Sequence, residues 1–252
     1  MLTQTVMGRV YDYSHAVGGR YIPQPVGLAL GKGDMVYVLS RPSDAISGVE
    51  WNKTGVGCKV TKITIGSVPG DEEFVTEFSK YGDEDGQIIW PAGIALDNEE
   101  NVYVTDEWLN RVSVFDSEGD LLKIWGRPGE GDGQFNRPAK PAVDSQGYIY
   151  VADWGNERVQ VLGPDGSFQL KLRGEATVSK WAREFLDVNP DESLTRDQSN
   201  LIPDLPSHLD TPYLVSTQTE PYFWGPTSVN LDGQGRLYVT ESSRHRVQIY
   251  QK

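Results

Sequence analysis

Cysteine, histidine and long apolar stretches are scarce in this sequence of 252 residues. Its one cysteine, Cys58, excludes a disulfide within the chain and favours a reducing compartment. The three histidines lie far apart and form none of the short spacings typical of metal sites. Because no apolar run approaches membrane-spanning length and the first residues lack signal-peptide character, we expect a cytoplasmic protein without a membrane partner.

Basic residues are also few relative to acidic ones. The chain has 23 Lys and Arg residues against 36 Asp and Glu residues, which gives a formal net charge of −13. Binding to nucleic acid depends on clustered Lys and Arg, so we expect no nucleic-acid partner. With 38% hydrophobic residues, the composition is that of an acidic, soluble and folded protein.

One motif occurs four times along the chain. The copies are QPVGLALGKGDMVYVLS from Gln24, WPAGIALDNEENVYVTD from Trp90, RPAKPAVDSQGYIYVAD from Arg137 and GPTSVNLDGQGRLYVTE from Gly225. In each copy a proline precedes a tyrosine by twelve residues. Four recurrences of that spacing indicate a true repeat, which in a chain of short strands predicts a repeat architecture.

Each copy reads as four strands, a to d, separated by turns rich in Asp, Asn and Gly. Strand c opens with Arg-Val in three copies, whereas the first copy reaches Lys59 and Val60 only after an insertion over roughly residues 42–57. Four-stranded modules that cannot bury their faces alone are typical of propeller blades. We therefore predict an all-β fold, a β-propeller of four-stranded antiparallel blades.

The repeat boundaries predict a single propeller domain over residues 1–252. The repeats fall at about 24–82, 86–126, 134–173 and 222–252, and residues 8–16 resemble a strand d that would pair with the last strand c and close the ring. In an alternative arrangement, two chains complete one larger ring by exchanging end strands.

A second insertion, residues 175–221, interrupts the array. Trp181 and Phe185 line one side of a predicted helix near 177–188, with Thr177 or Ser179 as its cap. The prolines of its second half predict an irregular strap. The segment either covers apolar surface on a blade or forms a lid or partner-binding surface, because loops on a rigid scaffold are where binding sites are built.

Two segments carry a resemblance to a known family. They are GQIIWPAGIALDNEENVYVTDEWLNRVSVFDSEGDLL from Gly86 and GDGQFNRPAKPAVDSQGYIYVADWGNERVQVLGPDGSF from Gly131, and they resemble the NHL-repeat β-propeller family. The resemblance implies a propeller, which in this family usually has six blades, whereas four repeats are counted here. Propellers of similar appearance include calcium-dependent lactonases and peptide-amidating lyases, which hold a metal on the axis with inward carboxylate, Asn or His ligands. Strand a of this chain offers mainly small residues there: Gly27, Ala29, Gly93, Ala95 and Ala142, with Asn230.

A polar turn recurs between strands b and c. In it an acid precedes an arginine by five residues, an arrangement that predicts a hydrogen-bonded ion pair across the turn. The residues of this motif are Asp106, Asn110, Arg111, Asp153, Asn156, Arg158, Glu241 and Arg246. A catalytic group is needed once and a fold-holding group in every blade, so we interpret this motif as structural.

These observations favour a non-enzymatic binding or scaffolding propeller whose loop-bearing face takes a protein or small-molecule partner. The candidate residues of that face are Trp51, Trp108, Trp154, Trp181, Arg183, Phe185 and His245. We predict no cofactor and name no catalytic or metal-binding residue. The alternatives are a metal-assisted hydrolase or lyase, for which Ca²⁺ would be the metal, and a homo-oligomer in which two chains complete a ring.

Overall fold

The computed structural model describes residues 3–6, 9–12, 14–18, 22–41 and 57–251. The chain folds as two compact units. Unit 1 comprises Met1–Leu109 with Ser113–Ile124, and unit 2 comprises Asn110–Val112 with Trp125–Lys252. The predicted insertion loop at 42–57, including Trp51, lies almost wholly outside the described residues.

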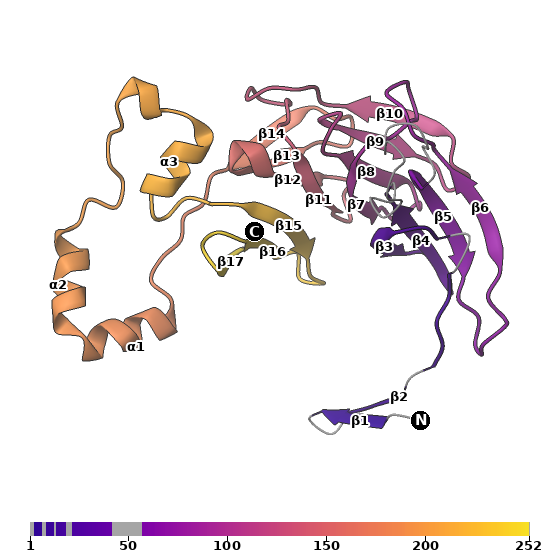
Figure 1. The fold of residues 1–252 in the computed structure, drawn as a ribbon, viewed down its shortest axis with the longest axis horizontal. Helices are drawn as coiled ribbons and strands as arrows, with labels where there is room; N and C mark the ends of the chain where they lie inside the picture. The colour runs from indigo at the N-terminus through magenta and orange to yellow at the C-terminus, as the bar shows by residue number, and fades with distance from the viewer. Residues whose placement is uncertain (1–2, 7–8, 13, 19–21, 42–56, 252) are drawn as a thin grey trace, which may run out of the picture. The chain divides into compact units, whose positions relative to one another are not determined.

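The first two repeats each form a four-stranded antiparallel sheet (Figure 1). The strands of repeat 1 are β3 (Pro25–Leu30), β4 (Met35–Ser40), β5 (Lys59–Thr64) and β6 (Phe74–Phe78). Those of repeat 2 are β7 (Pro91–Leu96), β8 (Val102–Asp106), β9 (Arg111–Phe115) and β10 (Leu121–Trp125). Each sheet follows the predicted order a-b-c-d.

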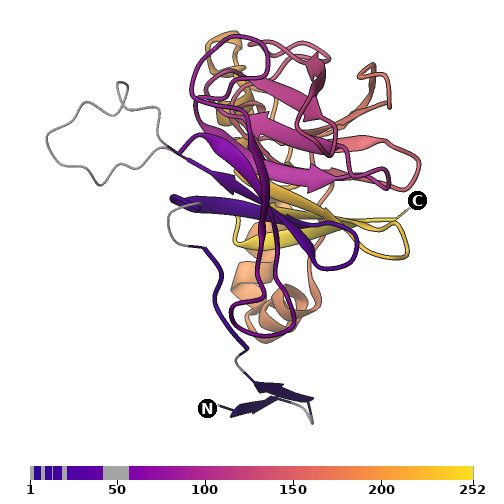
Figure 2. The same ribbon diagram turned by 90° about the vertical axis from the view of Figure 1, so that its right-hand side faces the viewer.

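Repeats 3 and 4 join in one seven-stranded sheet of unit 2. Repeat 3 contributes β11 (Pro138–Val143), β12 (Ile149–Asp153), β13 (Arg158–Leu162) and β14 (Phe168–Leu172). Repeat 4 contributes β15 (Pro226–Leu231), β16 (Leu237–Glu241) and β17 (Arg246–Tyr250), which Figure 2 shows in yellow. The strands a of the two repeats, β11 and β15, pair in parallel with Lys140 opposite Ser228.

The turn between strands a and b explains the spacing of proline and tyrosine. In repeats 2 to 4 an aspartate lies midway between them and accepts backbone N–H groups of the turn with one oxygen, as Asp97 does from Glu99 and Asn101 (2.9 and 2.8 Å). Its other oxygen accepts the tyrosine hydroxyl. These hydroxyl contacts are Tyr103 to Asp97 (3.0 Å), Tyr150 to Asp144 (3.3 Å) and Tyr238 to Asp232 (2.9 Å). The repeated sequence therefore encodes a closed turn together with the strand that follows it.

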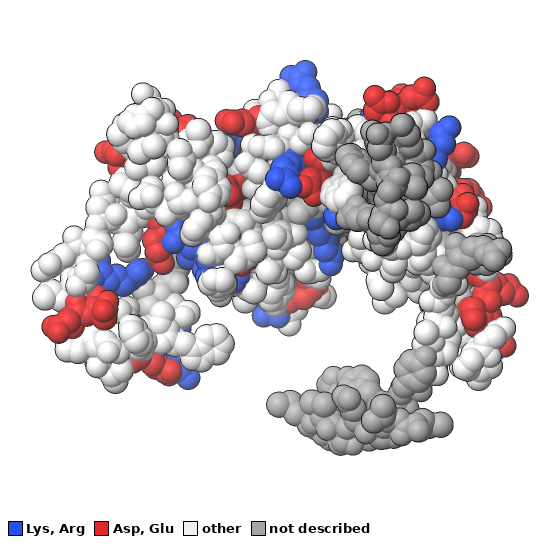
Figure 3. All heavy atoms as spheres, in the orientation of Figure 1, with Lys and Arg blue, Asp and Glu red and all other residues white. Residues whose placement is uncertain are grey.

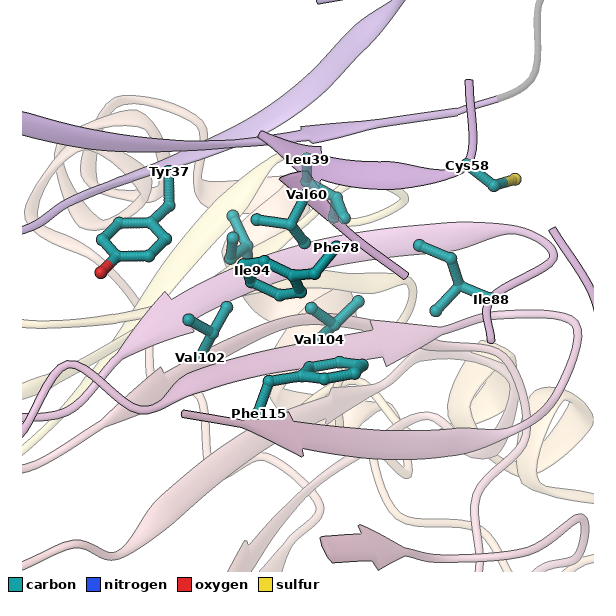
Figure 4. Close-up of a cluster of buried hydrophobic side chains, with 10 residues drawn as sticks. All are labelled: Tyr37, Leu39, Cys58, Val60, Phe78, Ile88, Ile94, Val102, Val104 and Phe115. Carbon is teal, nitrogen blue, oxygen red and sulfur yellow. The ribbon is translucent and has the colours of Figure 1, made fainter. Parts of the chain in front are cut away.

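Apolar side chains of adjacent repeats pack together inside each unit. In unit 1, Val60 and Phe78 of repeat 1 lie in one cluster with Ile94, Val104 and Phe115 of repeat 2 (Figure 4). In unit 2 a second cluster joins residues of repeats 3 and 4, among them Val159 and Val229. A repeat therefore buries its faces against its neighbour, as a repeat architecture requires.

The insertion between β14 and β15 is helical along much of its length. The predicted helix is confirmed as α1 (Lys180–Val188), with Ser179 as its cap, whose Oγ accepts the N–H of Ala182 (3.2 Å). The prediction of an irregular strap is wrong, because this part of the insertion contains further helices. They are α2 (Pro190–Gln198), a short 3-10 helix η3 (Ser207–Leu209) and α3 (Pro212–Gln218). Pro190 and Pro212 lie in the first turns of their helices, where the missing N–H costs no hydrogen bond.

The predicted pairing of residues 8–16 with the last strand c is not confirmed. The strand in this segment, β2 (Arg9–Asp12), pairs with β1 (Thr3–Val6) in an antiparallel hairpin (Figure 2). Among the described strands, β17 ends the seven-stranded sheet with β16 as its neighbour. Within the part of the chain that the structure describes, no helix is long and apolar enough to cross a bilayer.

Candidate binding site

In repeat 3 the acid and the arginine of the polar turn form a buried ion pair. Asp153 Oδ2 lies 2.8 Å from Arg158 Nε, and both side chains are almost fully buried. The Asn156 amide donates to the same oxygen (2.8 Å), and a 3-10 turn, η2 (Trp154–Asn156), carries it there. Burial raises the pKa of the Asp153 carboxyl, while its hydrogen bonds and Arg158 oppose that shift.

In repeat 4 the arginine of the equivalent pair also contacts the helical insertion. Glu241 Oε1 accepts from Arg246 Nε (2.7 Å), and Arg246 Nη2 also donates to the carbonyls of Glu220 and Tyr222 at the end of the insertion (3.0 and 2.8 Å). Asp106 of repeat 2 holds its own turn by accepting the N–H groups of Trp108 and Leu109 (both 2.9 Å). The carboxylates of these turns thus accept hydrogen bonds from the protein itself.

A pocket of about 470 Å³ lies between the helical insertion and the b–c turn of repeat 4. It is lined by the start of α1, by Arg196 of α2, by Glu220 and by residues 244–246. Figure 3 shows basic and acidic side chains next to each other in this region, between the helices and the strands of repeat 4. The insertion and the repeated turn, which lie far apart in sequence, therefore share one concave surface.

The charged wall of the pocket is mainly cationic. Glu220 lies 3.3 Å from Arg196 and 3.7 Å from Arg246, so one carboxylate bridges two guanidinium groups. Arg244 donates to the carbonyls of Ser216 (2.7 Å) and Thr219 (3.2 Å). Burial, with Arg246 nearby, lowers the pKa of Arg244. Three arginines and one carboxylate thus line a pocket of a strongly acidic chain, and Glu241 pairs with one of the arginines, Arg246.

Another part of the lining is apolar. It is made of Val178, Ala182, Phe185 and Leu186, with Phe185 more than half exposed. Ser179, the cap of α1, also lines the pocket. Cationic and apolar side chains in one pocket are suited to an anionic group attached to an apolar body.

The structure brings only some of the predicted face residues to this pocket. Phe185 and His245 line it, whereas Trp181 and Arg183 lie on exposed positions of α1 outside the lining. Trp154 lies beneath the guanidinium of Arg137 (4.2 Å), a cation–π contact within unit 2. Trp108 is exposed on the b–c turn of unit 1.

The sequence prediction missed Arg196, Glu220 and Arg244. Arg244 had a signal, because Leu109 and Asn156 occupy its position in repeats 2 and 3, so a cation there departs from the repeat. Arg196 and Glu220 had none, since both lie in the insertion, which no repeat resembles. Among the described residues, no group of three or more His, Cys, Asp or Glu side chains is arranged to hold a metal ion.

Two segments of the chain match the model of a known protein family. Residues 135–162 and 223–250 match the family model described as NHL repeat. The resemblance seen in the sequence is therefore confirmed for repeats 3 and 4, which match the NHL-repeat model, and the fold is β-propeller-like. No curated protein matches the sequence.

Solved structures extend the similarity over nearly the whole chain. One is hydrazine synthase of Kuenenia stuttgartiensis, with 13% identity and a TM-score of 0.51 over 96% of this chain and 49% of that chain. Another is a structural genomics protein of unknown function from Bacteroides thetaiotaomicron, with 15% identity and a TM-score of 0.51 over 89% of this chain and 46% of that one. This chain spans about half the length of each, and at such identity the likeness shows the fold alone.

Proposed function

We propose that this protein is a binding or scaffolding propeller that takes an anionic, partly apolar ligand in the pocket between α1 and residues 244–246. The observation that carries the proposal is the lining itself, which combines three arginines with the apolar side of α1. In a chain of net charge −13, such a group of guanidiniums would attract anions locally. The ligand is a carboxylate or phosphate joined to an apolar body, carried by a protein partner or a small molecule.

The guanidinium groups supply the polar half of this recognition. Arginine binds carboxylate and phosphate through paired N–H donors, and these charge-assisted bonds are stronger than neutral ones. Glu220 holds Arg196 and Arg246 in place before a ligand arrives, since it contacts both. A ligand anion therefore meets an ordered site, which reduces the entropy lost on binding.

Fluorescence titration with 1-anilinonaphthalene-8-sulfonate tests the site, because this probe joins a sulfonate to an aromatic body. We expect Arg196→Ala to raise its Kd about tenfold, in line with the loss of one charge-assisted bond. Arg183→Ala is the matched control, since Arg183 is exposed on α1 outside the pocket and its loss should leave the Kd unchanged. Phe185→Ser tests the apolar part of the lining in the same way and should raise the Kd. Val188→Ser is its control, since Val188 is exposed on α1 outside the pocket.

Equal effects of the Arg196 and Arg183 variants would overturn the proposal, because only the first lines the pocket. Displacement of the bound fluorophore by decanoate but not by an acidic, apolar peptide would indicate a small-molecule ligand, and the reverse would indicate a protein partner. The proposal involves no metal or cofactor. Bound Ca²⁺ or Zn²⁺ found by elemental analysis would instead favour a hydrolase or lyase.

We also propose that the four repeats act as blades of a closed propeller, with a fourth strand lying along β17. Support comes from the three other repeats, in each of which strand c lies between strands b and d. An unpaired strand edge is a template for another strand, and propellers avoid such edges by closing.

A further inference from the structure

The residue immediately before each strand c, here called the junction residue, joins one repeat to the next. In the first three repeats its side chain contacts the backbone just ahead of the next strand a. These contacts are Cys58 Sγ to the carbonyl of Ile89 (3.3 Å), the N–H of Arg137 to Asn110 Oδ1 (2.7 Å) and the N–H of Gly225 to Glu157 Oε2 (2.5 Å). Each repeat therefore holds the start of the following one.

His245 is the junction residue of repeat 4. It has the same left-handed backbone conformation (φ 52°) as Asn110 (54°) and Glu157 (52°), which directs its side chain from an equivalent position.

The face of β17 is apolar and exposed where the other strands c are buried. Val247 is 52% exposed and Ile249 is 58% exposed. The residues at the same positions of the other repeats are at most 7% exposed: Val60, Lys62, Val112, Val114, Val159 and Val161. Val60 and Val159 are covered in part by strand a of the next repeat, through Ile94 and Val229. The outer face of β17 thus has the side chains of an interface between repeats, and none of the described residues covers it as the next repeat covers Val60 and Val159.

Repeat 1 presents the matching half of that interface. Leu28 of β3 lies three residues after its proline, as Ile94 and Val229 do in their own strands, yet it is 61% exposed where they are 3% and 0%. Gln24, which precedes that proline, has a positive φ of 38°, like Arg137 (55°) and Gly225 (72°), whose N–H groups junction residues hold. The backbone of Gln24 therefore has the same conformation as the two residues whose N–H groups donate to junction residues.

A groove along β17 has room for a further strand. This cavity, also about 470 Å³, lies between residues 175–179 and the length of β17. Strand β2 has the chain spacing of a strand d that precedes repeat 1. β2 ends at Asp12, twelve residues before Gln24, the residue that precedes the proline of repeat 1. The strands d of repeats 1 and 2, β6 and β10, likewise end twelve residues before the residue that precedes the next strand-a proline.

From these half-interfaces we infer that two copies of this chain associate head to tail. Strand β2 of the second copy adds to the free edge of β17, its Leu28 covers Val247 and Ile249, and its Gln24 N–H donates to His245. This rests on the proposed closure of the propeller and assigns the strand that achieves it. A second copy is the occupant because one chain carries both halves of this interface: His245 and the face of β17 form one half, and Leu28 and Gln24 form the other.

Light scattering of the full chain after gel filtration tests the association. We expect twice the mass of one chain for the unmodified protein. Leu28→Glu and Val247→Glu should each produce monomers, since each buries a charge in the interface. Val68→Glu is the matched control, because Val68 is exposed in the connection between β5 and β6 and belongs to neither β3 nor β17, and it should remain dimeric. Thermal melting verifies that all three variants are folded.

Mixing the two variants tests the head-to-tail geometry. A mixture of Leu28→Glu and Val247→Glu chains retains one intact interface, between unaltered Val247 of one chain and unaltered Leu28 of the other, so it should form dimers that neither forms alone. Absence of dimers in the mixture would overturn the head-to-tail arrangement. If the unmodified protein is a monomer, the role of a second copy is overturned. Closure within one chain would in that case be indicated by a melting temperature of Val247→Glu below that of the unmodified protein.

His245 has a test of its own. His245→Ala should weaken dimerisation about two- to tenfold, the range of one hydrogen bond, whereas His245→Asn should preserve it because asparagine holds the junction between repeats 2 and 3. Equal dimer affinities of the two variants would overturn the junction role. The Leu28→Glu monomer should still bind the sulfonate fluorophore, since the pocket lies in unit 2, so failure of the pocket proposal and failure of the association are separable.

Discussion

Glu157 accepts a hydrogen bond from the backbone N–H of Gly225, a residue 68 positions further along the chain. The carboxyl is almost fully buried, and between the two residues lies the whole helical insertion. Glu157 thus fixes the start of β15 against repeat 3, whatever the intervening segment does. A titratable group at such a junction makes the attachment of repeat 4 dependent on pH.

Stability should fall as the pH rises from about 4.5 to about 7. Burial raises the pKa of Glu157 from 4.5 to about 7; Glu241 raises it further, whereas the Gly225 N–H and Arg173 oppose the shift. The folded state then binds more protons than the unfolded state between these two values. The free energy of unfolding therefore decreases across that window, by at most about 1.4 kcal/mol per pH unit for one group.

Urea denaturation from pH 4 to pH 8 measures this dependence. Glu157→Gln keeps an acceptor for the Gly225 N–H but cannot ionise, so its advantage over the unmodified protein should grow with pH and level off above the folded pKa. Parallel stability curves for the two proteins would show that Glu157 does not titrate in this range.

The buried ion pair of repeat 3 should be sensitive to the loss of one partner. Asp153→Asn leaves Arg158 with an uncompensated charge in a site that excludes water, which should cost about 3–5 kcal/mol of unfolding free energy. Lys180→Ala removes the exposed pair with Glu184 on α1 and should cost about 0.3–0.5 kcal/mol. Chemical denaturation distinguishes these values, and similar losses in both variants would contradict the structural role of Asp153.

Repeat 1 lacks the aspartate of the a–b turn, and a carboxylate of the neighbouring repeat lies at that place. Gly31 occupies the position, and Glu100 of repeat 2 accepts the N–H of Lys32, a different N–H group of the turn (2.6 Å). Glu100→Ala should destabilise the protein by about 0.5–1.5 kcal/mol, the value of one hydrogen bond.

Restoring the aspartate tests this relation between the two repeats. The Glu100 carboxylate lies where a side chain at residue 31 would begin, so Gly31→Asp alone should be destabilising. In the Glu100→Ala background the same change should cost less, giving a favourable coupling energy in a double-mutant cycle. Additive effects would indicate that the two positions are independent.

Cys58 should be unreactive in the folded protein. Its thiol is buried and donates to the carbonyl of Ile89, and burial raises its pKa to about 12, with Asp106 adding to the shift. Since the thiolate is the nucleophile, iodoacetamide should label the native protein far more slowly than the protein in urea. Rapid labelling of the native chain, followed by mass spectrometry, would be inconsistent with this burial.

The repeat could be predicted from sequence because its signals are local. Pro91, Asp97 and Tyr103 lie within one turn and two strands, and the hydrogen bonds that Asp97 accepts from Asn101 and Tyr103 need no distant part of the chain. The helix after Ser179 was predictable for the same reason, since a cap and an apolar face lie within a few residues. The prolines were misread because their meaning depends on position, and a proline in the first turn permits the helix that it would break further along.

The amino-acid sequence by itself determined the four copies, their strands and the turns that join them. Only the tertiary structure decided which residues lie at the pocket, because Arg196, Glu220 and Arg246 come from three segments that meet through long-range packing. The junction between Glu157 and Gly225 is likewise invisible in sequence, since its two ends lie 68 residues apart. Local hydrogen bonding thus specifies each repeat, whereas contacts between distant segments specify where one repeat meets another and where a ligand would bind.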